Sequence, residues 1–338
     1  MIKGREIHLA ARPVGEPRSS DFEIVEVDVP DPGPGEVLIR NTWMSVDPAM
    51  RPRMDDTPSY APPYALGAPM EGAALGEVVA SGVHELEPGS VVVHWLGWRE
   101  YALVNSRHAR AIRRVDLQLA PPEAHLSVLG HTGFTAWLGL FEIARLKPAD
   151  VVFVSGAAGA VGSLAGQMAK IHGLRVIGSA GSPEKVSHLL DDLGFDAAFN
   201  YRDGDVMELL REAAPDGIDV YFDNVGGRHL EAAIDSMRDH GRVAICGTIS
   251  SYNVADATQG LRNEFQLVAK RLRLQGFLMR DHLDRMDRFL AEATGWLRDG
   301  QLVHRTTVSE GLENAPDAFI GMLRGRNVGK MLVRLDGS

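Results

Sequence analysis

Cysteine is nearly absent from this chain, because Cys246 is the single one among 338 residues. One cysteine excludes an intrachain disulfide and a four-cysteine structural zinc site. The 12 histidines show no spacing typical of metal ligands, and Cys246 lies far in the sequence from any cluster of histidines. We therefore expect a zinc-independent protein, and a reducing compartment suits it.

Long apolar runs and an excess of basic charge are also lacking. Runs such as residues 151–154 are far shorter than the roughly 20 residues that a membrane helix needs. The first residues soon turn charged and no long apolar stretch follows, which argues against a signal peptide. With 35 basic and 45 acidic residues the net charge is -10, which disfavours nucleic acid and anionic membranes as partners. We expect a cytoplasmic protein with a small-molecule substrate.

Short runs rich in β-branched residues, each bounded by glycine or proline, occupy the first 125 residues. This pattern is typical of a small barrel or sandwich of mostly antiparallel strands. Proline, glycine and aspartate crowd residues 52–69, where we expect a surface loop. The strand-like runs are 37–40, 77–80, 90–94 and 101–104.

Strand-like and helix-like segments alternate from about residue 126 onward. This alternation predicts a doubly wound parallel sheet, and therefore an α/β protein. The strand-like tail 330–334 is expected to rejoin the first domain, so we place one domain at 1–126, completed by 303–338, and the other at 127–302. The expected strands are 151–155, 175–178, 197–200, 219–222, 242–245 and 272–276, and the expected helices are 161–171, 185–193, 205–213 and about 283–299.

A glycine triplet follows the first of these strands. Gly156, Gly159 and Gly162 lie between the strand and a helix with apolar residues at a 3.6-residue period. A helix N-terminus carries unpaired N–H groups and partial positive charge, and glycines let the backbone approach a phosphate. The position predicts binding of a dinucleotide pyrophosphate. The alternative is a turn that only packs the helix on the strand.

The end of the second strand has no acidic residue. Sites that prefer NAD place a carboxylate there to bind the ribose 2′-hydroxyl, whereas residues 178–182 offer none and Lys185 follows within a turn. A lysine beside a 2′-phosphate favours NADP over NAD. The alternative is that Lys185 is an ordinary solvated helix residue.

Six motifs resemble the zinc-free medium-chain dehydrogenase/reductases, within the group of prostaglandin reductases, plant double-bond reductases and bacterial curcumin reductase. They occur in the expected order over almost the whole chain, at 41–51, 133–137, 157–163, 221–227, 247–253 and 325–330. The resemblance implies a GroES-like domain, a Rossmann domain, a substrate cleft between them, bound NADPH and, commonly, a homodimer.

The resemblance also assigns residues to the cofactor by matching position. Lys185 and Tyr201 would bind the adenosine 2′-phosphate. The other implied cofactor-binding residues are Gly156, Ala158, Gly159, Ala160, Val161, Gly162, Asn224, Cys246, Gly247, Thr248, Ile249, Ser250, Tyr252, Phe277, Leu278, Met279 and Asn327.

Three groups are candidates for the proton donor. The phenol of Tyr252 is one, since a positioned donor can stabilise a developing enolate; alternatively Tyr252 packs the cofactor and water supplies the proton. His131, where relatives usually carry Met, is another, or it makes a structural hydrogen bond near a helix start.

Ala49 stands where relatives usually carry Tyr, so the substrate pocket differs there.

The expected reaction is reduction of the carbon–carbon double bond of an enone or enal. Such a substrate is already activated by its own carbonyl, so a site without zinc ligands can act by orienting the reactants and holding an oxyanion. Hydride goes from NADPH to the β-carbon. The alternatives are an NADPH quinone oxidoreductase on the same scaffold and a non-catalytic NADPH-binding protein.

Overall fold

The computed structural model describes residues 1–57, 59–105, 112–254 and 260–335, and the chain divides into two compact units. The amino-terminal unit holds Met1–Leu126, Thr306–Asn327 and the segment that begins at Met331. The central unit holds Ser127–Arg305 and Val328–Lys330. No helix among the described residues is long and apolar enough to cross a membrane.

The amino-terminal unit is built from antiparallel strands, as the sequence predicts. One sheet has the order β14-β15-β3-β4-β5-β7, with β6 paired to β3, and a separate hairpin joins β1 to β2. The hairpin was not predicted, because charged residues interrupt the apolar pattern of both its strands. The strands are β1 (Ile2–Leu9), β2 (Phe22–Val29), β3 (Val37–Ser45), β4 (Ala74–Ser81), β5 (Val91–His94), β6 (Tyr101–Val104), β7 (Arg113–Arg114), β14 (Thr306–Glu310) and β15 (Lys330–Arg334). The helices are α1 (Met50–Arg53), α3 (Pro122–Leu126) and α11 (Ala315–Leu323).

The described residues of 52–69 are mostly turn and coil at the surface, as the composition predicts, but two of their side chains are buried. Met54 is fully buried and Tyr64 is 3% exposed, both in the main apolar core of the unit. The Tyr64 hydroxyl donates to the carbonyl of Glu71 at 2.7 Å, which satisfies the phenol inside that core. The segment is therefore a surface loop anchored by two buried side chains, which the proline and glycine pattern does not predict.

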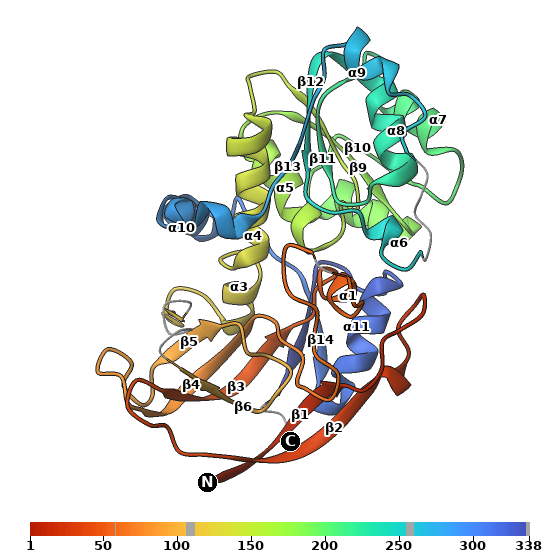
Figure 1. The fold of residues 1–338 in the computed structure, drawn as a ribbon. Helices are drawn as coiled ribbons and strands as arrows, with labels where there is room; N and C mark the ends of the chain where they lie inside the picture. The colour runs from red at the N-terminus through yellow and green to blue at the C-terminus, as the bar shows by residue number, and fades with distance from the viewer. Residues whose placement is uncertain (58, 106–111, 255–259, 336–338) are drawn as a thin grey trace. The chain divides into compact units, whose positions relative to one another are not determined.

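The central unit contains a six-stranded parallel sheet of order β10-β9-β8-β11-β12-β13 with helices beside it (Figure 1). The strand order reverses between β8 and β11, which is the switch point where doubly wound sheets bind ligands. The predicted α/β fold class is confirmed. The strands are β8 (Val151–Val154), β9 (Arg175–Ala180), β10 (Ala197–Asn200), β11 (Ile218–Asp223), β12 (Met237–Ile245) and β13 (Arg273–Gly276).

Helices α4 and α5 pack together, as do α7 and α8. One helix differs from its prediction at 185–193: α6 begins at Pro183, where Ser182 caps it, and the segment His188–Asp192 continues as a π-helix. The helices are α4 (His131–Leu138), α5 (Ala160–Ile171), α6 (Pro183–Ser187), α7 (Val206–Ala213), α8 (Gly227–Ser236), α9 (Phe265–Ala269) and α10 (Met286–Arg298).

Candidate functional site

The glycine turn lies between β8 and α5, as predicted. Gly156 has a φ of 59°, in the left-handed region that glycine enters without strain. A Cβ on Gly162 would lie 2.5 Å from the carbonyl oxygen of Gly156, too close for any side chain. The turn therefore needs glycine at both ends, because a residue with a side chain would be strained at position 156 and would clash at position 162.

The N-terminus of α5 points its first N–H groups out of this turn. Gly159 is the N-cap, with extended backbone and no side chain to cap the helix. Ala160 and Val161 form the first turn, and the first N–H groups of a helix have no intrahelical acceptor. Ala158 is 2% exposed beneath them. This arrangement suits a phosphate anion.

A second segment of the central unit, Val328–Lys330, runs along the glycine turn. The N–H of Gly329 donates to the carbonyl of Ala158 at 2.8 Å, and Gly329 forms an isolated parallel bridge with Gly159. Asn327, the predicted phosphate contact, directly precedes this segment in the chain. The fold thus brings Gly159 and Gly329, about 170 positions apart in the sequence, to one turn. The spacing of glycines in the sequence does not predict this contact.

A buried polar network lies at the ends of β8 and β11. The Tyr221 hydroxyl lies 2.6 Å from Asp223 Oδ1 and 2.8 Å from Ser155 Oγ. Asp223 Oδ1 also accepts from the N–H groups of Val225 and Gly226 at 2.9 and 2.8 Å. Burial raises the pKa of Asp223, and the hydrogen bonds to its carboxylate oppose that rise. Sequence reasoning missed this network.

The network fixes Asn224 at the switch point. Its N–H donates to Ser155 Oγ at 3.1 Å, and its side-chain amide donates to the Ser155 carbonyl at 2.8 Å. The Asn224 Cβ lies 3.7 Å from the place of a Cβ on Gly156. Asn224 is therefore held beside the glycine turn.

The segment Cys246 to Tyr252 is anchored to the same strand end. The N–H groups of Cys246 and Gly247 donate to the Asp223 carbonyl at 2.8 and 3.1 Å, and that of Ile249 donates to Asn224 at 3.3 Å. Burial, with a smaller contribution from the Asp223 charge, raises the pKa of the Cys246 thiol to about 12. The half-buried Cys246 is thus a neutral thiol near pH 7.

Tyr252 folds back over the start of this segment. Its hydroxyl accepts a long hydrogen bond from the N–H of Thr248 at 3.4 Å and lies 3.2 Å from the place of a Cβ on Gly247. Ser250 Oγ donates to the Val225 carbonyl at 2.6 Å, which ties the segment to the turn after β11. The phenol is therefore placed at the carboxyl edge of the parallel sheet.

Lys185 and Tyr201 come together at the end of β9. The N–H of Tyr201 donates to the carbonyl of Ala180 at 3.1 Å, and its hydroxyl lies 2.8 Å from the place of a Cβ on Gly181. The N–H of Lys185 donates to Ser182 Oγ at 3.3 Å. Burial lowers the pKa of the Lys185 ammonium, and the charge of a neighbouring arginine lowers it further. A cation and a phenol thus lie after the second strand, whose end at residues 178–182 carries no carboxylate.

The remaining predicted residues lie on other elements. Phe277 follows β13, and its ring meets Phe222 edge-on at a centroid distance of 6.4 Å; Leu278 and Met279 follow it into a 3-10 helix. His131 begins α4, and its carbonyl accepts from the Thr135 hydroxyl at 2.7 Å. Ala49 belongs to the amino-terminal unit, where it is exposed just before α1.

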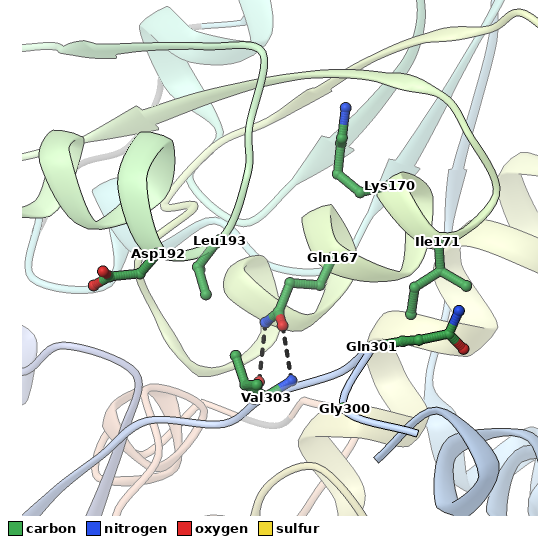
Figure 2. A pocket seen from close by; sticks show the side chains of 8 residues that line it. All are labelled: Gln167, Lys170, Ile171, Asp192, Leu193, Gly300, Gln301 and Val303. Carbon is green, nitrogen blue, oxygen red and sulfur yellow. Dashed lines mark hydrogen bonds between the residues drawn. The ribbon is translucent and has the colours of Figure 1, made fainter. Parts of the chain in front are cut away.

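A surface hollow in the central unit does not contain the predicted site (Figure 2). Gln167, whose side chain makes two hydrogen bonds to the backbone of Val303 at 3.0 and 2.9 Å, closes one side. Lys170 is held by Asp196 at 2.9 Å. Both lie in the carboxyl-terminal half of α5, away from the glycine turn at its other end. The hollow is lined by Gln167, Lys170, Ile171, Asp192, Leu193, Gly300, Gln301 and Val303.

Metal ligands do not gather anywhere in the described part of the chain, where no three His, Cys, Asp or Glu side chains form a group that could hold an ion.

Two family models match this sequence. One, for the N-terminal domain of oxidoreductases, matches residues 5–112. The other, described as a zinc-binding dehydrogenase, matches residues 160–294.

Relatives match along nearly the entire length. A putative NADP-dependent oxidoreductase of Bacillus subtilis is 44% identical over 98% of this chain and 97% of its own. The NADPH-dependent curcumin reductase of Escherichia coli is 38% identical over 99% and 98%. The NADP-dependent 2-alkenal reductase of Nicotiana tabacum is 38% identical over 98% and 97%.

A solved structure has the same fold. CurA from Vibrio vulnificus, in complex with NADPH, is 40% identical, with a TM-score of 0.93 over 99% of this chain and all of that one. Its match and those of the relatives extend through both units. The chain therefore belongs to the medium-chain dehydrogenase/reductases, in the group of NADP-dependent oxidoreductases that includes curcumin reductase and 2-alkenal reductase.

Proposed function

We propose that this protein uses NADPH to reduce the carbon–carbon double bond of an α,β-unsaturated ketone or aldehyde. The observation that carries the proposal is the pairing of the glycine turn with Lys185 and Tyr201 after an acid-free second strand. Relatives named as reductases of curcumin and of 2-alkenals support the choice of substrate class.

The residues present fit NADPH. Crowding keeps position 162 of the turn a glycine, and the N-cap of α5 leaves its first N–H groups for a pyrophosphate. The pair Lys185 and Tyr201 fits a 2′-phosphate. Asn224 and the segment 246–252 follow β11 and β12, on the side of the glycine turn away from Lys185 and Tyr201. We assign Asn327 and Phe277–Met279 to the same cofactor on the strength of the family resemblance.

Bound NADPH supplies a hydride to the β-carbon of the substrate. The chain holds the pyrophosphate at α5 and fixes the edge of the sheet through the Asp223 network, so that the reactants are oriented before reaction. The Tyr252 phenol donates a hydrogen bond to the enolate oxygen or a proton toward the α-carbon. His131 and water are the other donors that we retain.

A steady-state assay of NADPH consumption tests this function. Enones, enals and quinones are offered in parallel, and the products are identified by mass spectrometry. The proposal expects saturated ketones or aldehydes from the first two classes. Turnover of quinones alone would instead make the protein a quinone oxidoreductase, and tight NADPH binding with no turnover would make it a non-catalytic binder.

Zinc independence is a further part of the proposal. The chain has one cysteine, so a structural zinc site of four cysteines cannot form. We expect purified protein to hold less than one zinc per chain by elemental analysis and to keep its activity in a chelator. Loss of activity on chelation, restored by zinc, would contradict this.

Homodimer formation and a cytoplasmic location complete the proposal. Strand β13 is last in the order of the described parallel strands, and nearby α9 exposes Phe265 at 77% and Val268 at 72%. An exposed strand edge beside apolar side chains suits pairing with a second copy.

We infer a cytoplasmic site of action because the proposed cofactor is an intracellular metabolite, and cell fractionation checks it.

A further inference from the structure

Arg202 is a cation without a carboxylate partner among the described residues, and it lies beside the proposed 2′-phosphate site. It follows Tyr201 directly after β10, and its guanidinium carbon lies 5.8 Å from the centroid of the Tyr201 ring. The adjacent acid, Asp203, is bound to the side-chain amide of Asn200 at 2.6 Å. An exposed guanidinium with this surrounding is available for an anion.

The ring on which Arg202 lies is held in place. His229 is buried at 6% exposure, and its ring meets that of Tyr201 edge-on, at 5.3 Å and an interplanar angle of 78°. The backbone of Tyr201 is fixed to Ala180 by the hydrogen bond described above. Because the His229 ring and the hydrogen bond to Ala180 hold Tyr201 in place, its ring can orient a guanidinium that stacks against it.

Lys185 and Arg202 bring two positive charges to one place. The charge on Arg202 is, after burial, the next cause that lowers the pKa of the Lys185 ammonium, so the two cations interact. Like charges that converge repel one another. The nearby Glu184 carboxylate opposes the effect of Arg202 on Lys185, but its contribution is the smaller of the two. A phosphate dianion relieves that repulsion and accepts hydrogen bonds from both groups.

We propose that Arg202 is a second cationic ligand of the adenosine 2′-phosphate and contributes, with Lys185, to the preference for NADPH over NADH. The planar guanidinium offers two parallel donors to phosphate oxygens, whereas Lys185 offers a single charged amine. This inference rests on the proposed use of NADPH. It adds a specificity-determining residue that sequence reasoning did not single out, although a basic residue directly after Tyr201 was a visible signal.

Calorimetric titration with adenosine 2′,5′-bisphosphate and with 5′-AMP tests the role of Arg202. These ligands differ by the 2′-phosphate and carry no nicotinamide, so their binding does not depend on any reduction. Arg202→Gln should weaken binding of the bisphosphate about tenfold and leave that of 5′-AMP unchanged. Arg298→Gln, at a side chain that is 77% exposed and pairs with Asp299, is the matched control and should change neither.

Two results would overturn the proposal for Arg202. Unchanged bisphosphate binding would show that the guanidinium does not contact the phosphate. Equal weakening of both ligands would show that it supports the fold of the site. If the wild-type protein binds both ligands equally, the proposed preference for NADPH is itself wrong. This result is seen before any variant is made, so it is distinguished from a failure of the proposal for Arg202.

Discussion

At the scale of single residues, the proposed cofactor site depends on positions that lack a bulky or charged side chain as much as on the side chains that are present. Gly162 leaves the turn open, the second strand ends without an acid, and Cys246 is a neutral thiol. The sequence revealed the first two, because glycine spacing and the absence of a carboxylate are visible in text. Burial, which keeps Cys246 neutral, is visible only in three dimensions.

Gly162→Ala should weaken NADPH binding by tenfold or more. Its Cβ would meet the Gly156 carbonyl at 2.5 Å, so the turn must shift, at a cost of about 1–3 kcal/mol in stability. Fluorescence titration of NADPH and thermal unfolding measure the two effects. Gly295→Ala in α10, where a Cβ meets nothing within 4 Å, is the control and should leave NADPH binding unchanged. Equal NADPH affinity in both variants would argue against phosphate binding at this turn.

Tyr252→Phe should lower kcat for enone reduction by about 10–100-fold while NADPH affinity changes little, if the phenol is the proton donor. The variant removes the hydroxyl and its long hydrogen bond from Thr248 but keeps the ring. Single-turnover kinetics in the wild type, Tyr252→Phe and His131→Met separate the candidates. A large loss in His131→Met alone assigns the donor to His131, and no loss in either variant assigns it to water.

At the scale of elements, the proposed cofactor site lies where β8, β9, β11 and β12 end. The alternation of strands and helices predicted this edge, since parallel strands carry their carboxyl ends to one side. It did not predict the Ser155–Tyr221–Asp223 network, because buried polar side chains within strands look like ordinary strand residues. The π-helix after α6 and the β1–β2 hairpin escaped prediction for similar reasons, since tertiary packing overrides local pattern there.

Strands β3 and β5 are joined by a buried histidine, and this makes stability depend on pH. The His94 Nε2 lies 2.7 Å from Asn41 Oδ1, and His94 Nδ1 accepts from the N–H of Leu96 at 3.1 Å, so the ring is neutral and fully paired. Burial, with a smaller effect of the Arg99 charge, lowers the pKa of His94 to about 3. Because the unfolded chain binds this proton more readily, stability is full above about pH 6.5 and is lost as pH falls toward 3.

Because of His94, the free energy of unfolding should fall by roughly 1.4 kcal/mol for each pH unit below 6.5. His94→Gln should therefore lower stability at pH 7 but show a shallower fall between pH 6.5 and 5 than the wild type. Denaturant unfolding followed by circular dichroism at several pH values measures both. A variant whose pH dependence matches that of the wild type would show that His94 does not carry the effect.

At the scale of the whole molecule, the chain matches its relatives along nearly its full length, and both units take part in that match. The net charge of -10 suits a protein that acts on small molecules. The sequence alone predicted the family and the cofactor, because six separated motifs recur in order. The identity of the natural substrate depends on pocket shape, which neither motifs nor composition encode.

The proposed homodimer gives a prediction at this scale. A double change, Phe265→Glu with Val268→Glu, adds charge to two side chains that are more than two-thirds exposed and should convert the dimer to a monomer. Light scattering coupled to size-exclusion chromatography measures the mass. Because neither side chain is buried, thermal unfolding of the isolated chain should change little, and a variant that stays dimeric would place the interface elsewhere.

The most direct test of the account is the fate of the transferred hydride. An enone is reduced with NADPH that carries deuterium at C4 of the nicotinamide, in each of its two stereospecific forms, and the product is examined by NMR. We predict a saturated ketone with one deuterium at the β-carbon from one of the two forms, and a solvent-derived hydrogen at the α-carbon. Deuterium at the carbonyl carbon of an allylic alcohol would contradict the account.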